Sequence, residues 1–318
     1  MKQEALLTFG KYLKKKYRTK VVKIPIGLSG FTCPNIDGTV AKGGCTFCLN
    51  ESFSPNMGTE YKITLNPNSA TNPLLEVQLN ELDEQIRRGR EALKHKGVKK
   101  FLVYFQAFTN TYAPLETLKI LFEKALSYDD VIGLSIGTRS DSISDEVLDY
   151  LSELHKTKEI WVEYGVQSIH DITLKRINRG HDARSVKEMI LKTKERGLNV
   201  CAHLIYGLPG EDTKMMLEST KEVYKWGVDS IKYHPLYVVR NTMLANEYKN
   251  REFKPITIEE YTSILIQALK LKPKNISIQR VTAGSANDGV IAPSWCAWSK
   301  NRAMQFVKKE LVKEHLYF

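Results

Sequence analysis

Hydrophobic and polar positions follow two alternating patterns along the chain from Val21 to about Pro235. Short apolar stretches, which predict strands, are separated by longer amphipathic stretches, which predict helices. The predicted strands are Val21–Leu28, Lys100–Phe105, Val131–Ile136, Glu159–Val166, Asn199–Ile205 and Ser230–His234. The predicted helices are Leu74–Lys96, Pro114–Ser127, Ser144–His155, Arg184–Arg196 and Thr213–Trp226. Six strands interleaved with helices indicate an α/β fold built on a parallel sheet.

Several of these strands carry polar residues at alternate positions. Because successive side chains of a strand point to opposite faces, the polar residues share one face of the sheet. They are Tyr104, Gln106, Ser135, Glu163, Gln167, Cys201, His203, Lys232 and His234. An open doubly wound sheet, with helices on both faces, would be apolar throughout. We therefore predict a partial (β/α)6 barrel with a polar lumen, in which Lys232 and His234 contact substrate near the C-terminal ends of the strands.

Beyond Pro235 the alternation weakens. We expect a basic N-terminal segment (1–20), a barrel (21–235) and a C-terminal helical and strand extension (236–318) that caps the barrel. The extension is predicted to contain a helix, a strand and a basic amphipathic helix, over Ile258–Leu271, Ile276–Val281 and Trp298–His315.

A loop in this extension, TAGSANDGVIAPSWC, is too apolar at its end to be a plain linker. We expect it to close the barrel mouth and to contact substrate through Arg280, Asp288 or Trp295. The alternative for Trp295 is that its indole packs in the core.

The composition suits one large domain, because 42% of the 318 residues are hydrophobic. No stretch approaches the ~18 apolar residues of a membrane span, so we expect a cytoplasmic protein whose thiols stay reduced. The net charge of +11 is compatible with a polyanionic partner such as RNA. The densest basic runs, Lys11–Lys20 and Lys94–Lys100, precede strands and belong to the rim opposite the active site. Basic residues that follow strands are better candidates for RNA contacts, namely Arg139, Arg179, His181, Arg184 and Arg240.

Three of the five cysteines, Cys33, Cys45 and Cys48, stand in one segment rich in turn-forming residues. Such a loop can direct three thiolates at one centre. Soft thiolate ligands select zinc, copper(I) or iron–sulfur clusters. A closed zinc site needs a fourth ligand, and this loop offers neither another Cys nor a His. A zinc site would therefore need a distant His, whereas three thiolates on a four-iron cluster would leave one iron open to bind another molecule.

This segment resembles the cluster loop of radical S-adenosylmethionine (SAM) enzymes, which hold a [4Fe-4S] cluster through three cysteines. The ending Cys-Thr-Phe-Cys48 matches that superfamily, and the long gap after Cys33 is similar to that of the Elongator catalytic subunit and the YhcC/YtqA (MnmL) family. The GVQS and NRGH segments, at 165–168 and 178–181, resemble a signature of several radical SAM families. HLIYGLPG from His203, Ile-Gln-Arg280 and Ile-Ala-Pro-Ser-Trp295 are similar to the YhcC/YtqA family, so that the resemblance covers nearly the whole chain.

The resemblance implies that SAM is bound by residues that follow the strands. By it, a polar turn after the second strand binds the amino group, a guanidinium after the third binds the carboxylate through two hydrogen bonds, and a side chain of the fifth strand meets the ribose. The implied SAM-binding residues are Gln106, Thr109, Asn110, Arg139, Gln167, Arg179 and His203, and the implied cluster ligands are Cys33, Cys45 and Cys48. A salt bridge with Asp141 is the alternative for Arg139.

The resemblance also implies a function. SAM is cleaved reductively, with an electron from a donor such as flavodoxin or ferredoxin, to a 5′-deoxyadenosyl radical that attacks a substrate inside the lumen. For the YhcC/YtqA family the implied substrate is the wobble uridine of tRNA, whose 5-carboxymethylaminomethyl group becomes an aminomethyl group. Cys296 is a candidate donor of a hydrogen atom to a substrate radical, or else a packing residue.

Two other functions stay open at this point. One is a small-molecule radical SAM oxidase or decarboxylase of the coproporphyrinogen dehydrogenase type. The other is a non-catalytic, zinc-bound RNA-binding protein.

Overall fold

Parallel strands form the central sheet of the computed structural model, which describes residues 4–49, 56, 63–283 and 289–318. Within these ranges the strand order is β2-β3-β4-β5-β6-β7-β9, and all neighbours are parallel. The bounds are β2 (Val21–Ile26), β3 (Lys100–Phe105), β4 (Val131–Thr138), β5 (Glu159–Gln167), β6 (Asn199–Tyr206), β7 (Ser230–Pro235) and β9 (Ser277–Arg280). The first six correspond to the strands predicted for the barrel, and β9 lies within the strand predicted over Ile276–Val281.

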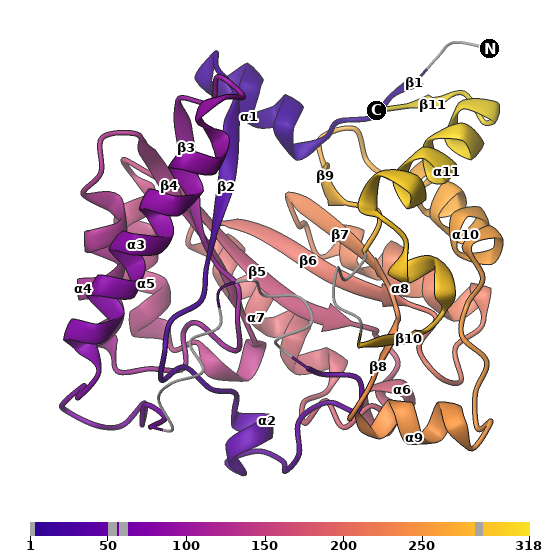
Figure 1. The fold of residues 1–318 in the computed structure, drawn as a ribbon, viewed down its shortest axis with the longest axis horizontal. Helices are drawn as coiled ribbons and strands as arrows, with labels where there is room; N and C mark the ends of the chain where they lie inside the picture. The colour runs from indigo at the N-terminus through magenta and orange to yellow at the C-terminus, as the bar shows by residue number, and fades with distance from the viewer. Residues whose placement is uncertain (1–3, 50–55, 57–62, 284–288) are drawn as a thin grey trace.

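Helices pack on the outer side of this sheet, which curls into a half-barrel (Figure 1). The side chains of Asp182 and Asp212 cap the N-termini of two of these helices. Each carboxylate accepts a hydrogen bond, at 2.8 Å, from the backbone N–H three residues later. The helices that alternate with the strands are α3 (Leu75–Lys94), α4 (Leu115–Leu126), α5 (Asp145–His155), α6 (Asp171–Arg176), α7 (Ala183–Glu195), α8 (Thr213–Lys225) and α10 (Ile258–Lys270). The predicted α/β half-barrel is confirmed.

The seventh strand, β9, comes from the segment predicted as a C-terminal extension. It pairs with β7, where Ile231 lies beside Ile278 and Lys232 beside Arg280. The extension thus adds a strand to the sheet and places Arg280 level with Lys232 inside the half-barrel. A domain boundary at 235 stays a prediction.

The N-terminal end of the lumen is closed by α1 (Phe9–Tyr17), part of the basic segment. Phe9 packs edge-on against Trp161, with ring centroids 4.9 Å apart. The buried Glu159 carboxylate binds Lys16 Nζ and the Tyr17 hydroxyl, each at 2.6 Å, and fastens the helix to β5. The lumen is therefore covered at this end, and the candidate site residues lie toward the opposite end, where the strands terminate.

The rest of the extension packs beside the barrel. Trp295 is only 4% exposed, and its ring centroid lies 5.4 Å from that of Tyr261 with the rings tilted by 41°. Its Nε1–H donates to the Ile256 carbonyl at 3.0 Å. Cys296 lies in the same core. Both placements agree with the packing alternative, whereas Asp288 lies outside the described residues. The remaining elements are β1 (Glu4–Ala5), α2 (Pro34–Asp37), η2 (Ser140–Ser142), β8 (Val238–Val239), α9 (Met243–Lys249), β10 (Val290–Ala292), η3 (Ser294–Ala297), α11 (Lys300–Lys313) and β11 (Leu316–Tyr317).

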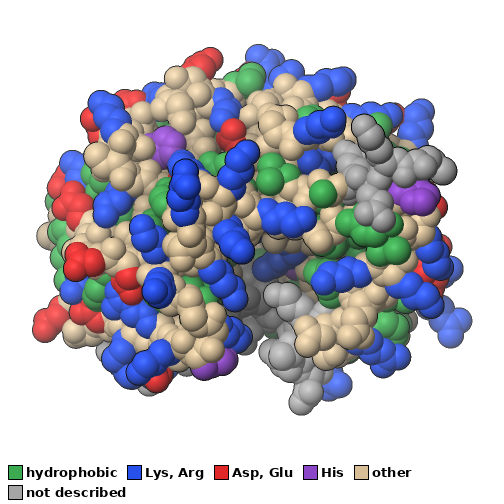
Figure 2. Space-filling view, turned by 90° about the horizontal axis from the view of Figure 1, so that it is seen from above, with side chains coloured by type: hydrophobic (Ala, Val, Ile, Leu, Met, Phe, Trp, Pro, Cys, Tyr) green, Lys and Arg blue, Asp and Glu red, His purple; other side chains and the backbone are tan. Residues whose placement is uncertain are grey.

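Basic side chains are spread over the end of the molecule that carries α1 (Figure 2), with Asp and Glu mostly toward its edges. This is the rim to which the basic runs were assigned from the sequence, on the far side of the lumen from the cysteine loop. Among the described helices, none is long and apolar enough to cross a membrane.

Candidate active site

The cysteine loop folds back on itself through short turns. Cys33 precedes α2 (Pro34–Asp37), and its carbonyl accepts a hydrogen bond from the Ile36 N–H at 2.7 Å. The N–H of Cys48 donates to the Cys45 carbonyl at 2.9 Å, which closes a second turn. As a result, all three cysteines line one cavity at the C-terminal ends of the strands.

The three thiols share this cavity, but their sulfurs do not all lie within 4.8 Å of one another. Burial, with Cys45 and Cys33 close by, raises the pKa of the Cys48 thiol to about 12, so a thiolate here needs a cation beside it. Tetrahedral zinc, with Zn–S bonds of about 2.3 Å, holds its sulfurs about 3.8 Å apart. Within the part of the chain that the structure describes, the only trio of His, Cys, Asp or Glu ligand atoms lying within 4.8 Å of one another is Glu163, Cys201 and His203. The wider spacing of the three sulfurs suits a metal cluster better than one zinc ion.

The loop between α6 and α7 supports the cysteine loop. The Asn178 side chain donates to the carbonyls of Lys42 and Gly44 at 3.0 and 2.8 Å, and the Asn178 carbonyl accepts from the Asn35 side chain. Gly180 has a φ of 78°, and a Cβ there would lie 2.3 Å from Asn35 Oδ1. Only glycine fits this close contact. The NRGH segment thus has a structural reason for its Asn and Gly.

Two side chains donate hydrogen bonds to the sulfur of Cys45. They come from Asn35 Nδ2 at 3.6 Å and from Arg179 Nη1 at 3.7 Å. Arg179 also donates from Nη2 to the Gly165 carbonyl at 2.7 Å, while its buried Nε has no partner among the described atoms. A Cβ on Gly165 would approach that Nη2 to 2.8 Å. Arg179 therefore lies between the cysteine loop and the end of β5.

Arg139 and Gln167 both line the cavity with unsatisfied polar atoms. Arg139 binds Asp141 through Nε and Nη2 at 2.8 and 2.5 Å, which is the expected salt bridge, yet its buried Nη1 has no partner in the described structure. Gln167 follows a register shift in β5, has a φ of 68°, and buries Oε1 without a described partner. A left-handed residue other than glycine costs about 1–2 kcal/mol. Buried polar atoms without partners are rare, and these suit a polar ligand.

Two other predicted SAM contacts, Gln106 and Thr109, also line the cavity. Asn110 has a different role, because its backbone and side-chain N–H groups both donate to the Gly137 carbonyl at 3.0 Å. It joins the ends of β3 and β4. Its expected contact with SAM stays a prediction.

The basic residues expected at the mouth differ in their surroundings. His181 is half-buried near Arg179 and Arg139, and burial together with these charges lowers the pKa of its imidazole to about 3. Arg184 is exposed on α7 and pairs with Glu188 at 2.8 Å. Arg240 is exposed after β8. Of the five basic residues proposed for RNA contacts, Arg139 and Arg179 line the cavity. Their contacts with RNA stay a prediction.

Glu163 is the centre of the lumen floor and is completely buried. One carboxylate oxygen accepts hydrogen bonds from Lys23 and Ser135, and the other accepts from Lys232 and from His203. Burial opposes ionisation of this carboxyl, but the two ammonium groups outweigh burial and hold its pKa well below its usual range. Glu163 is therefore an anion whose lone pairs are already used.

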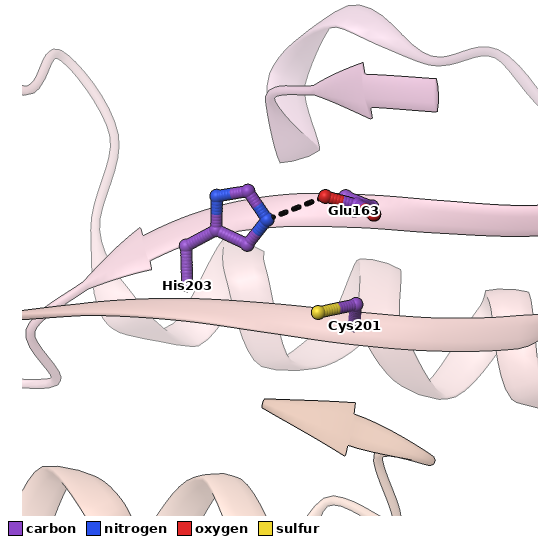
Figure 3. A group of neighbouring side chains, drawn as sticks. All are labelled: Glu163, Cys201 and His203. Carbon is purple, nitrogen blue, oxygen red and sulfur yellow. Dashed lines mark hydrogen bonds and ion pairs between the residues drawn. The ribbon is translucent and has the colours of Figure 1, made fainter. Parts of the chain in front are cut away.

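His203 lies on the same floor, with Nε2 2.8 Å from Glu163 Oε2 (Figure 3). Burial, followed by the charge of Lys232, lowers the pKa of His203 to about 4. The ring is thus neutral at pH 7, and because a carboxylate can only accept, Nε2 carries the proton. Nδ1 is left as an acceptor.

Cys201 lies beside Glu163 and His203 (Figure 3), but two nearby ammonium groups already serve as the counter-charges of the carboxylate. Burial and the neighbouring Glu163 raise the pKa of Cys201 to about 12. A bound cation would have to displace a lysine and ionise this thiol. The trio is a structural charge network rather than a metal site.

Sequence reasoning missed Lys23 and Gln279, which complete this floor. Lys23 Nζ donates to Gln279 Oε1 at 2.6 Å and to Ser135 Oγ at 2.9 Å, and lies 4.5 Å from the centre of the Tyr104 ring. Burial lowers its pKa to about 8 despite the neighbouring Glu163. The available signal was a single lysine inside an otherwise apolar strand.

Arg280, Lys232 and His234, expected as substrate contacts, all line the cavity. Lys232 is held by Glu163 and by the Tyr104 hydroxyl at 2.9 Å. Arg280 Nη1 lies 3.5 Å from His234 Nδ1. The same cavity thus joins the cysteines at its rim to a cationic floor.

Comparison with known proteins identifies the family of this architecture. Residues 38–223 match the model of the Radical SAM superfamily, and residues 228–313 match that of the Radical_SAM C-terminal domain. The protein YhcC of Escherichia coli (strain K12) is 35% identical over 300 residues, which cover 92% of this chain and 88% of YhcC. YtqA of Bacillus subtilis (strain 168) is 35% identical over 312 residues, covering 98% of this chain and 90% of YtqA.

A shorter similarity links the chain to a tRNA uridine(34) acetyltransferase of Methanocaldococcus infernus, with 32% identity over 153 residues, 47% of this chain and 28% of that protein. Among solved structures, the archaeal Methanocaldococcus infernus Elp3 superposes with a TM-score of 0.62 at 21% identity. The superposition covers 92% of this chain and 63% of that one, and shows a shared fold.

Proposed function

We propose, from the premise that the chain belongs to the radical SAM superfamily, that this enzyme modifies the wobble uridine of tRNA. The superfamily uses a [4Fe-4S] cluster and SAM. When bound, these groups supply the one-electron chemistry by which a hydrogen atom is removed from a substrate. The protein contributes ligands, orientation and exclusion of water.

The residues at the cavity rim fit both groups. Cys33, Cys45 and Cys48 are the thiol ligands for the cluster, with a spacing too wide for one zinc ion. The unsatisfied Nη1 of Arg139 suits a carboxylate such as that of SAM, and the unsatisfied Oε1 of Gln167 suits an N–H or O–H donor. This combination of thiols and unpaired polar atoms disfavours a purely structural zinc knuckle.

On the floor, His203 is placed to orient a hydroxyl-bearing ligand. Its Nε2–H is held by Glu163, so the Nδ1 lone pair can accept from a ribose hydroxyl. The sequence departs here from the coproporphyrinogen enzymes, in which an Asp occupies this place. A neutral histidine supplies the same acceptor without adding a second negative charge beside Glu163.

The observation that carries the proposed substrate is the continuity of this cavity from the cysteines to Lys232 and Arg280. A substrate group that reaches past the rim meets a floor with a surplus of positive charge. The side chain of 5-carboxymethylaminomethyl-uridine ends in a carboxylate, which complements that charge. We propose that the enzyme breaks the bond between the side-chain nitrogen and the carboxymethyl carbon and leaves the aminomethyl form. The carboxymethyl carbon would lose a hydrogen atom and an electron, balanced by the reductive cleavage of SAM, and hydrolysis of the resulting imine by water would release the two carbons as glyoxylate.

Three further features support an RNA substrate. The chain has a net charge of +11, and the resemblance to the YhcC/YtqA family pointed to wobble uridine. Nearly half of the chain is similar to a protein named tRNA uridine(34) acetyltransferase. These features favour tRNA over the small-molecule substrates of the coproporphyrinogen type.

A second groove beside the cysteine loop could hold a neighbouring nucleotide. It is lined by Tyr248 and Phe253, whose ring centroids are 6.3 Å apart, and by the exposed Arg251 and Lys254. The start of α9 is bound to the cysteine loop, because the Leu244 N–H donates to the Thr46 carbonyl at 2.9 Å. RNA-binding proteins recognise unpaired loop bases through such aromatic faces and cations.

The direct test compares modified nucleosides in tRNA from cells with and without this protein by mass spectrometry. Loss of the protein is expected to raise 5-carboxymethylaminomethyl-uridine and to lower the aminomethyl form. In parallel, protein reconstituted with iron and sulfide under anaerobic conditions should convert an anticodon stem–loop carrying the modified uridine, with consumption of SAM. Unchanged wobble nucleosides together with no conversion would refute the proposal.

A further inference from the structure

The charges on the lumen floor do not balance. Lys23, Lys232 and Arg280 contribute three positive charges, and Glu163 contributes one negative charge. Four side chains other than Arg280 donate to the Glu163 oxygens, so no lone pair is left for Arg280. Among the described residues, no acidic side chain forms an ion pair with Arg280, whose Nη1 instead lies 3.5 Å from Nδ1 of neutral His234.

The pair formed by Arg280 and His234 presents only donors to the cavity. Because the guanidinium donates to His234 Nδ1, the ring proton is on Nε2. Burial and the charge of Arg280 lower the pKa of His234 well below its usual range, so the ring adds no charge of its own. The remaining guanidinium N–H groups keep their fork geometry, which matches a carboxylate.

We propose that Arg280, oriented by His234, forms a carboxylate-binding subsite that holds the terminal carboxylate of the substrate's uridine side chain. The identity of the carboxylate rests on the proposed function, whereas the anion preference follows from the charges of the floor. The subsite is a specificity determinant, because it distinguishes a side chain that ends in a carboxylate from one that ends in an amine.

The carboxylate of SAM belongs elsewhere in the cavity. Arg139 and Arg179 act electrostatically on the Cys48 thiol, so they lie near the cluster ligands. Arg280 acts instead on the floor residues Tyr104, His203 and His234. The rim and the floor thus each have a guanidinium, and one cavity can receive two carboxylates from two different molecules.

The first experiment measures substrate discrimination with the reconstituted holoenzyme. Arg280→Gln is expected to lower kcat/KM for a stem–loop bearing 5-carboxymethylaminomethyl-uridine about 10- to 100-fold. Its affinity for the aminomethyl stem–loop, which lacks the carboxylate, and its affinity for SAM should stay within about twofold. Arg280→Lys keeps the positive charge but loses the two parallel N–H donors of the guanidinium. Its kcat/KM for the same stem–loop should therefore lie between those of wild type and Arg280→Gln. Arg88→Gln, an exposed change on α3, controls for the loss of one positive charge.

The second experiment needs no RNA. In wild-type holoenzyme, acetate at constant ionic strength is expected to raise the thermal midpoint, and acetamide, its neutral analogue, is not. Arg280→Gln should abolish the acetate effect, provided that circular dichroism shows the variant to be folded; if it is not, Arg280→Lys is used and should reduce the effect.

The two experiments separate failure of the subsite from failure of the proposed function. If wild type does not convert the modified uridine but acetate acts through Arg280, the proposed function fails and the subsite stands. If wild type converts the uridine and Arg280→Gln leaves discrimination and the acetate shift unchanged, the subsite is overturned and the function stands. An acetate shift absent from wild type, or equal in wild type and variant, also overturns the subsite.

Discussion

The two ends of the cavity satisfy their polar groups in opposite ways. At the rim, the polar atoms of Arg139, Gln167 and Arg179 include buried atoms without a partner in the described structure. On the floor, Glu163 is paired on both oxygens. The rim is built to be completed by other molecules, whereas the floor already pairs its carboxylate. Among the described floor groups, Gln279 Nε2 has no partner, and three cations face one anion, with Arg280 outside the ion pairs of Glu163.

This difference follows from the elements that form each end. The rim consists of loops that follow the strands, where the backbone can adopt conformations such as the left-handed φ of Gln167. The floor consists of side chains on the strands themselves, whose positions are fixed by the parallel register that sets Glu163 beside Cys201 and His203 beside Lys232. The loops of the rim can vary in conformation to fit a cofactor, whereas the strands of the floor hold its charged side chains in fixed positions.

The largest effect is expected from replacing a rim thiol. Cys33→Ala, Cys45→Ala or Cys48→Ala should each abolish SAM cleavage, because three thiolates are required to hold the cluster and leave one iron open. The measurement is iron and sulfide content together with 5′-deoxyadenosine formation under anaerobic conditions. Cys296→Ala, in the core, is the control and should retain the iron. Full activity in a zinc-only preparation would contradict this prediction.

The next effect concerns the floor. Glu163→Gln leaves Lys23 and Lys232 buried without their counter-charge, so the free energy of unfolding should fall by about 3–5 kcal/mol. Urea unfolding monitored by circular dichroism measures this. In the double variant Glu163→Gln/Lys23→Met, one of the two unpaired charges is gone, and part of the loss should be regained. A loss below about 1 kcal/mol in the single variant would show that the floor network is not tightly coupled.

The rim could be predicted from the sequence more completely than the floor. Cys33, Cys45 and Cys48 are separated by turn-forming residues, so local chemistry alone brings them together. Alternation within strands placed Glu163 in the lumen, but it could not show that this carboxylate would collect four donors. Those donors come from β2, β4, β6 and β7, and their meeting depends on sheet curvature. Non-local register is not visible in a single sequence.

The C-terminal third shows the same limit. The strand containing Arg280 was predicted, but its pairing with β7 depends on packing across the whole barrel. The apolar loop before the last helix was expected to offer Trp295 to a substrate. The structure instead places this indole against Tyr261 in the core, because a large apolar side chain next to an uncovered helix is stabilised by burial there. The sequence of α1, which closes the lumen, showed only a run of basic residues and did not indicate this role.

An effect of intermediate size is expected from the titration of His203 on the floor. Because the pKa of His203 falls from 6.5 to about 4 on folding, the unfolded chain binds more protons than the native one between these values, so this contribution to stability is present above pH 6.5 and is lost as pH falls toward 4. From pH 7 to pH 5 the loss is about 1–2 kcal/mol. His203→Asn should remove that part of the pH dependence in urea unfolding. An unchanged slope in the variant would contradict the low native pKa.

The smallest effect is expected at the rim, where Asn35 donates a hydrogen bond to Cys45 Sγ at 3.6 Å. Hydrogen bonds to cluster sulfurs raise the reduction potential, because they stabilise the more negative reduced state. One such bond of about 0.5–1 kcal/mol corresponds to about 20–40 mV for a one-electron couple. Asn35→Ala should therefore lower the potential of the reconstituted cluster by roughly that amount, measured by anaerobic redox titration monitored by electron paramagnetic resonance. His203→Asn, which alters the floor, should leave the potential unchanged; equal shifts in both variants would show that the two ends of the cavity are coupled rather than independent.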